Sequence, residues 1–142
     1  MKTSLLKYIF LGGFCVFLIA CSVRKDTFLS RNSHAVATKY NILYNGGLAL
    51  DKGIEELKTT YGDNYWEVLP IERMQPGEKD LPPRKEVTPN ANFAPAEEKA
   101  TKAIQKHSMN IDGTEKNPQI DEAYLMLGKA RYYDKRYLPA LD

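Results

Sequence analysis

The stretch AYLMLGKARYYDKRYLPALD, residues 123–142, decides how this chain is expected to fold. Small and large apolar residues recur along it at helical spacing, up to the last position. A helix with such an apolar face needs a partner that covers it. We therefore expect either that the polypeptide continues beyond Asp142 or that another molecule covers this face.

The spacing in this stretch resembles the tetratricopeptide pattern W-x2-L-G-x2-Y…A. Five residues carry the resemblance and are expected to have structural roles, namely Tyr124, Leu127, Gly128, Tyr137 and Ala140. Tyr124 stands at the Trp position, Leu127 and Gly128 form the Leu-Gly pair, and Ala140 stands where the second helix of the repeat opens. Two positions depart from the pattern: Arg131 replaces the usual Tyr, and Lys135 stands where a turn Gly is common.

The resemblance implies an all-α fold of antiparallel helix hairpins, as in tetratricopeptide α-solenoids. Residues 95–142 would be the start of the repeat region, ending shortly after its second helix opens. Solenoids of this kind need about three repeats for stability. We therefore expect the chain to be the N-terminal piece of a longer repeat protein, truncated at its C-terminus.

A helix is predicted just before this stretch, opening at Ala94-Pro95, because proline suits the first turn of a helix. Small residues line one narrow face of it at helical spacing: Ala96, Ala100, Ala103, Ile104 and His107. Such a face permits close packing against another helix. After a loop, Asn117 is the predicted N-cap of the next helix, with Pro118 at its first position.

A helical hairpin is predicted over residues 31–62. Two apolar stripes at helical spacing define its helices: Val36, Tyr40, Leu43 and Tyr44, then Leu50, Ile54, Leu57 and Tyr61. Between them, Asn45, Gly46 and Gly47 tolerate positive φ and predict the turn. A glycine pair can also mark a kink in one long helix, so that alternative stays open.

Residues 63–94 are predicted to form an extended, Pro-rich linker, because six prolines between positions 70 and 95 exclude a long helix. Residues 65–74 are richer in apolar side chains and are expected to cross the helices, whereas residues 75–92 are expected to be more mobile. Tyr61, Tyr65 and Trp66 form an aromatic cluster. It can either stack on sugars or cover the open end of a helix pair.

Residues 1–20 are predicted to be an export signal. Lys2 and Lys7 precede an apolar run of about 13 residues, which is shorter than the roughly 20 residues that span a bilayer as a helix. The run ends in LIAC and resembles the lipobox of bacterial lipoproteins, so Cys21 is the predicted lipid-attachment residue. Residues 21–30 would tether the folded part to the membrane. The residues after Cys21 carry no acidic pair, which favours the outer membrane with the protein facing the periplasm.

Composition argues against several classes of function. Without the signal, 18 basic residues balance 18 acidic ones, so a basic face for nucleic acid has no support. The mature chain would keep no free thiol, because Cys15 leaves with the signal and Cys21 carries lipid. The only histidines, His34 and His107, are expected on different helices. We therefore predict no enzyme activity, no catalytic residue, no metal site and no cofactor.

Three stretches together resemble the beginning of the SprE/PorW lipoproteins of Bacteroidota: RNSHAVATKYNILYNGG, YGDNYWEVLPIERM and the run from His107 to Asp142. The resemblance implies a membrane-anchored helical-repeat scaffold in type IX secretion and gliding motility. Its partners would be proteins of the secretion and motility machinery, and the membrane through the lipid on Cys21. No small-molecule substrate is expected. The alternative is a SusD-like lipoprotein that binds nutrients or glycans, with Tyr65 and Trp66 as stacking residues.

Overall fold

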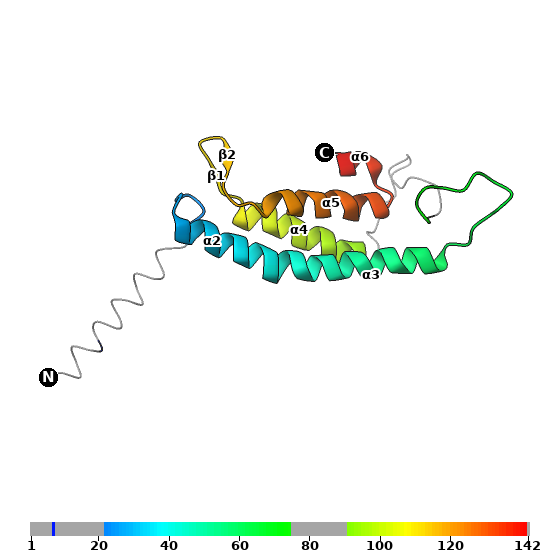
Figure 1. Cartoon of the computed structure of the whole chain (residues 1–142), viewed down its shortest axis with the longest axis horizontal. Helices are drawn as coiled ribbons and strands as arrows, with labels where there is room; N and C mark the ends of the chain where they lie inside the picture. Colours follow the sequence, from blue (N-terminus) through cyan, green and yellow to red (C-terminus); the bar gives the residue numbers. More distant parts are fainter. Residues whose placement is uncertain (1–6, 8–21, 75–90, 142) are drawn as a thin grey trace.

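The computed structural model describes residues 7, 22–74 and 91–141. The all-α prediction is confirmed in this part of the chain, where helices are joined by one short strand pair (Figure 1). The elements are α2 (Phe28–Val36), η1 (Ala37–Leu43), α3 (Tyr44–Thr60), α4 (Phe93–His107), β1 (Asn110–Ile111), β2 (Thr114–Glu115), α5 (Ile120–Tyr133) and α6 (Tyr137–Leu141).

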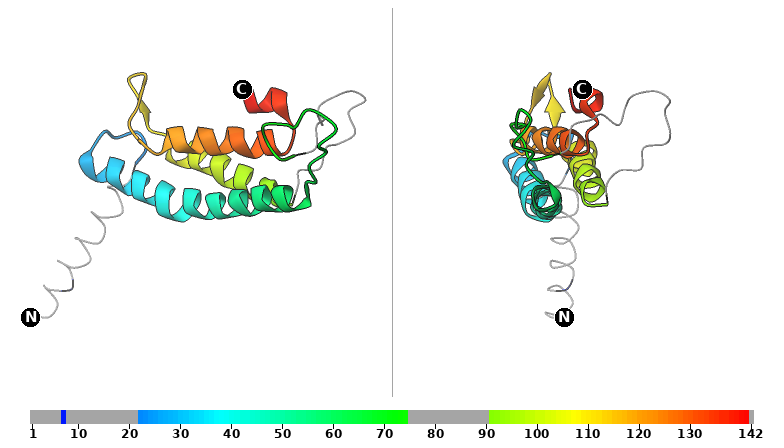
Figure 2. Two further views of the ribbon diagram at one scale, coloured as in Figure 1. Left: turned by 45° about the vertical axis from the view of Figure 1, so that its right-hand side comes forward. Right: turned by 90° about the vertical axis from the view of Figure 1, so that its right-hand side faces the viewer.

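The helices alternate in direction along the molecule. In Figure 1, α3 runs from left to right, α4 returns beneath α5, and α5 runs in the same direction as α3. Helix α6 then turns back over the end of α5, and both views in Figure 2 agree with this arrangement. Helix α4 contacts α3 on one side and α5 on the other, so the core lies along α4.

The predicted turn at Asn45-Gly46-Gly47 is wrong, and residues 31–62 are not a hairpin. The helix junctions at Ala37 and Leu43 both keep right-handed helical φ and ψ, so α2, η1 and α3 form one continuous helix. Its middle section, η1, is a π-helix. Of the two readings of the glycine pair, the long helix is the one observed, and Figure 1 shows it as a single rod.

Two glycines of this helix, Gly46 and Gly53, allow side chains of other helices to pack closely against its backbone. A Cβ atom on Gly46 would lie 2.7 Å from Met126 Cε, and one on Gly53 would lie 2.5 Å from Phe93 Cε1. Gly46 therefore admits a side chain of α5, and Gly53 admits the first ring of α4. By contrast, a Cβ on Gly47 would meet nothing within 4 Å.

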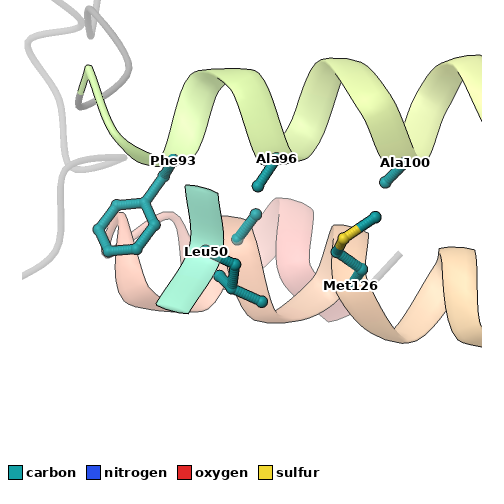
Figure 3. Close-up of a cluster of buried hydrophobic side chains, with 6 residues drawn as sticks. Leu50, Phe93, Ala96, Ala100 and Met126 are labelled. Carbon is teal, nitrogen blue, oxygen red and sulfur yellow. The ribbon is translucent and has the colours of Figure 1, made fainter. Parts of the chain in front are cut away.

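The small-residue face predicted for α4 forms the centre of the core. Ala96, Ala100 and Ala103 are fully buried, and Phe93 at the start of α4 is fully buried as well. Figure 3 shows Ala96 and Ala100 pointing from α4 toward the side on which Leu50 and Met126 lie. Because alanine and glycine take little space, three helix backbones approach one another here without leaving a void.

Of the first predicted apolar stripe, Leu43 packs against the core, but the other three residues face outward. Val36, Tyr40 and Tyr44 are 56%, 63% and 63% exposed, whereas Thr38 and Ile42 are buried. Two facts explain the difference. The π-helical section has more residues per turn than an α-helix, which rotates the buried face, and the crowded contact with α4 and α5 selects small side chains over tyrosines.

The loop predicted after α4 contains a β-hairpin. Its strands pair Asn110 with Glu115 and Ile111 with Thr114. Asp112 and Gly113 both have positive φ, of 52° and 73°, as the two-residue turns that favour Asp-Gly require. The hairpin sets the path of the chain from α4 into α5.

Three boundaries differ from the predictions. The predicted tether over residues 21–30 is too long, because α2 begins at Phe28 and Ser30 is buried, with its hydroxyl donating to Ser22 O at 2.6 Å. Helix α4 begins at Phe93, inside the predicted linker and two residues before the predicted start of the repeat region at residue 95. Helix α5 begins at Ile120 with Gln119 as its N-cap, and the Asn117 side chain instead accepts a hydrogen bond from Gln119 N.

The first part of the linker, residues 63–74, forms bends and turns without helix or strand, and residues 91–92 form a turn before α4. An ion pair of 3.3 Å between Arg73 and Asp63 closes this segment into a loop. Val68 and Ile71 are fully exposed, so these apolar side chains do not pack on the helices, whereas Glu72 and Met74 are half-buried. Burial first, and then the charge of Glu72, raise the pKa of Tyr133 on α5. The remaining linker residues, 75–90, lie outside the described residues, as do the predicted signal in residues 1–20, apart from Lys7, and Cys21.

Candidate functional site

The residues that match the repeat pattern lie at and around the corner between α5 and α6. Leu127 packs against the core, and a Cβ on Gly128 would lie 3.5 Å from the carbonyl oxygen of Ala140, so α5 and α6 touch there. Tyr137 packs its ring 5.6 Å from that of Tyr132. Tyr124 is 55% exposed and is not part of the buried core. Ala140 lies within α6, which already begins at Tyr137.

The two departures from the pattern have clear structural roles. Lys135 has a φ of 64°, so the turn position where repeats often carry Gly is left-handed here as well. Arg131, at the usual Tyr position, donates through Nη1 to Pro139 O at 2.6 Å and pairs through Nε with Glu97 Oε1 at 3.0 Å. The arginine thereby ties α6 to α5 and α4.

Glu97 is the centre of an ion network at this corner. Besides Arg131 it pairs with Arg136, whose Nε also donates to the buried Asp134 at 2.9 Å. Burial by itself raises the pKa of Glu97, but hydrogen bonds from Arg136 and Arg131 outweigh it, and the net pKa lies below the ordinary value. Glu97 therefore stays ionised and holds the α5–α6 turn in place.

Two grooves flank the exposed edge of α5. The first, which we call the α3–α5 groove, has a volume of about 560 Å³. It is lined by Lys39, Tyr40, Leu43, Tyr44, Gly47, Leu50, Pro118, Gln119, Glu122, Leu125, Met126 and Lys129. Tyr40 and Tyr44 of the first predicted apolar stripe thus form one wall of an open groove.

The second groove, which we call the α5–α6 groove, has a volume of about 740 Å³. It is lined by Tyr124, Leu125, Gly128, Lys129, Tyr132, Tyr133, Tyr137, Ala140 and Leu141. Leu125 and Lys129 belong to both grooves, so the two form a continuous surface over α5. Leu125 is 52% exposed at the centre of this surface.

A polar cluster lies at the other end of the bundle, where α2 and η1 meet the end of α4. His34 and His107, expected to be apart, have their Nδ1 atoms 2.9 Å from each other. Burial first, then the charges of His34, Lys106 and Lys102, lower the pKa of His107. The sequence carries no signal for this contact, because 73 residues separate the two histidines.

Asn117 joins this cluster to the loop before α5. Asn117 is 1% exposed, and its Nδ2 donates to Thr38 Oγ1 at 3.2 Å and to His107 O at 2.9 Å. Its backbone N–H donates to Glu115 Oε1 at 2.8 Å. Burial raises the pKa of Glu115, but hydrogen bonds, the first from Ser108, outweigh this effect and lower it. The hydrogen bonds of Asn117 therefore join the hairpin, α4 and η1.

Other candidate residues lie apart from these sites. Tyr65 and Trp66 are 80% and 95% exposed in the loop after α3, so they do not cover the end of the bundle. Within residues 22–74 and 91–141, no three His, Cys, Asp or Glu side chains are grouped as a metal would need. No helix among the described residues has the length and apolar character to cross a bilayer.

No protein-family model matches this chain, and no curated protein matches it either. The class of protein therefore follows from the structure: an all-α protein whose helices present an apolar, tyrosine-rich surface over α5.

Proposed function

We propose that this chain belongs to a membrane-anchored helical-repeat scaffold that mediates protein–protein contacts in type IX protein secretion and gliding motility. The observation that carries the proposal is the continuous groove surface over α5, with exposed leucine and tyrosine side chains at its centre. Exposed apolar surface that is rimmed by polar residues is typical of protein interaction sites. The scaffold would act through contacts, without a cofactor or a catalytic step.

The order of the helices supports a repeat architecture. Helices α3 and α5 would be the first helices of two successive repeats, and α4 and α6 the second helices. In this scheme α3 and α5 run parallel, with α4 packed against both (Figure 1). The left-handed Lys135, and the position of Ala140 within contact distance of a Cβ placed on Gly128, support the same scheme at the α5–α6 corner.

The charges beside the α3–α5 groove favour a particular partner chemistry. Lys39 and Lys129 line the groove together with a single acidic residue, Glu122. An apolar segment flanked by carboxylates would therefore complement it, with the apolar side chains on the tyrosines and the carboxylates on the lysines. We propose that a secretion-machinery protein supplies such a segment.

The anchor of the scaffold is proposed to be the lipid on Cys21, which would hold it on the outer membrane facing the periplasm. This proposal rests on the lipobox-like sequence and on the resemblance to SprE/PorW lipoproteins. Cys21→Ala in the full-length protein should move it from the membrane fraction to the soluble fraction and stop secretion. Full secretion with the variant still in the membrane would contradict the anchored mechanism.

The docking surface is tested by charge insertion in the bacterium that encodes the protein. Leu125→Arg places a charge at the centre of both grooves and should reduce secreted cargo and gliding strongly. Leu48→Arg is the matched control, because Leu48 is 54% exposed on α3 and lines neither groove. Equal secretion by the two variants, at equal protein levels, would refute the groove as the docking site.

The alternative is a glycan-binding lipoprotein, which the exposure of Tyr65 and Trp66 favours. Exposed aromatic rings can stack on sugar faces. Glycan pull-down with the full chain tests this, with Trp66→Ala as the control. Specific sugar binding that disappears in Trp66→Ala would favour this function over the scaffold.

A further inference from the structure

The geometry of the contact between His34 and His107 is that of a direct hydrogen bond. The ring centroids are 5.2 Å apart and the Nδ1 atoms 2.9 Å apart. The distance between the centroids exceeds the distance between the Nδ1 atoms by about one ring diameter, so both nitrogens lie on the line between the ring centres. Two imidazoles that bind one metal ion would instead aim their lone pairs at a shared third point. One Nδ1 therefore donates a proton directly to the other.

Such a bond needs one proton between the two Nδ1 atoms. In the neutral pair, one Nδ1 carries hydrogen and the other accepts it. A first added proton, on a ring Nε2, leaves this bond intact. A second added proton must go to the accepting Nδ1, where two N–H groups would then point at each other. The doubly protonated pair cannot keep the contact.

The surroundings disfavour added protons. The Nε2 of His34 is buried and has no hydrogen-bond partner among the described residues, so a charge there is poorly solvated. The charges that act on His107 are those of His34, Lys106 and Lys102, all basic. The hairpin's carboxylate, Glu115, instead accepts hydrogen bonds from Ser108 and from backbone N–H groups. On α2, Arg31 pairs with Asp26 at 3.1 Å.

The pair is connected to the α3–α5 groove. Thr38 donates to the carbonyl oxygen of His34 at 2.8 Å and accepts from Asn117. The next residues along the chain, Lys39 and Pro118, both line the groove. Movement of α2 and η1 away from α4 would therefore displace one wall of the groove.

We propose that His34 and His107 form a pH-sensitive clasp, which holds α2 and η1 against α4 at neutral pH and opens under acid conditions. The clasp would close one end of the α3–α5 groove and release it when both rings are protonated. The direction of the pH dependence follows from the lowered pKa of His107, because the open state then binds protons more readily than the closed state. The closed state is therefore favoured above the ordinary histidine pKa of 6.5 and is weakened as the pH falls below it.

Hydrogen exchange of the full chain tests the clasp, with rates corrected for the intrinsic effect of pH. Opening that takes up protons should speed exchange of the α2 and η1 amides by up to about tenfold per proton for each pH unit below the ordinary histidine pKa of 6.5, until the lowered folded-state pKa of His107 is reached. The buried amides of α4 and α5 are the internal control and should stay protected. Equal protection of α2 at pH 8 and pH 5 would overturn the proposal.

A conservative variant separates the clasp from general acid sensitivity. His34→Gln keeps a group that can accept a hydrogen bond from a protonated His107, but it does not titrate. The variant should keep α2 protected at pH 5. If its α2 amides open at acid pH as in the unmodified chain, a different group controls the opening and the clasp is refuted. This test needs no partner, so its outcome is independent of the proposed scaffold function.

Discussion

Gly53 of α3 and Phe93 of α4 lie so close together that a methyl group at Gly53 would overlap the Phe93 ring. A Cβ atom at Gly53 would lie 2.5 Å from Phe93 Cε1 and 2.9 Å from Cζ. Phe93 is fully buried, and its ring stacks near that of Tyr133 on α5, with centroids 6.2 Å apart. The glycine thus lets one aromatic ring join three helices.

Gly53→Ala is expected to lower the free energy of unfolding by about 1 to 3 kcal/mol, because the buried ring cannot move without displacing its neighbours. Gly47→Ala is the matched control, since its Cβ would meet nothing within 4 Å. That variant should raise stability by about 0.5 to 1 kcal/mol through helix propensity. Urea denaturation measures both, and a neutral or stabilising Gly53→Ala would show that the contact is not tight.

Glu97→Gln is expected to lower stability by about 1 to 2 kcal/mol at neutral pH, because Arg131 and Arg136 lose a charged partner. The folded-state pKa of Glu97 is lowered, so its stabilising effect is present above the ordinary value of 4.5 and is lost as the pH falls through the folded-state pKa. Unfolding curves of the two proteins should therefore converge in acid. Glu98→Gln, one position along α4 and exposed, should have little effect at any pH.

Lys135→Gly tests the turn between α5 and α6. Lys135 has a φ of 64°, which costs a residue with a Cβ about 1 kcal/mol relative to glycine. The substitution should stabilise the turn by up to about 1 kcal/mol and slow hydrogen exchange in α6. Loss of stability instead would mean that the lysine side chain contributes more than the backbone strain costs.

The sequence predicted α4 and α5 well because their patterns are local. The alanine spacing of α4 and the apolar spacing of α5 each follow one helical period, and both helices were found within a few residues of the expected bounds. The Asp112-Gly113 pair is itself a local hairpin signal, because Asp-Gly favours a two-residue turn. The two strands that were not predicted could therefore have been predicted from this pair.

The long first helix was harder to predict for two physical reasons. A glycine pair inside a helix looks like a turn, since the steric demand of Met126 on Gly46 comes from 80 residues away in the chain. The π-helical section changes the period, so Val36 and Tyr40 face out although Leu43 of the same predicted stripe packs against the core. Both errors come from tertiary contacts that a local pattern does not contain.

The sites depend on tertiary contacts even more strongly. Glu97 of α4 pairs with Arg131 of α5 and with Arg136 in the turn between α5 and α6. His34 and His107 are likewise in contact although 73 residues separate them in the chain. Residue type gave no reason to pair them. The α3–α5 groove likewise exists only because the tyrosines of η1 and α3 face α5 across an open space.

The central claim is that the surface over α5 docks a component of the secretion machinery. A photoreactive amino acid placed at Leu125 in the full-length protein, in living cells, tests it most directly. We predict one strong cross-link from position 125 to a secretion-machinery protein and none from position 48, which is equally exposed outside the grooves. Cross-links of equal strength from both positions, or none from position 125 in cells that secrete normally, would contradict the account.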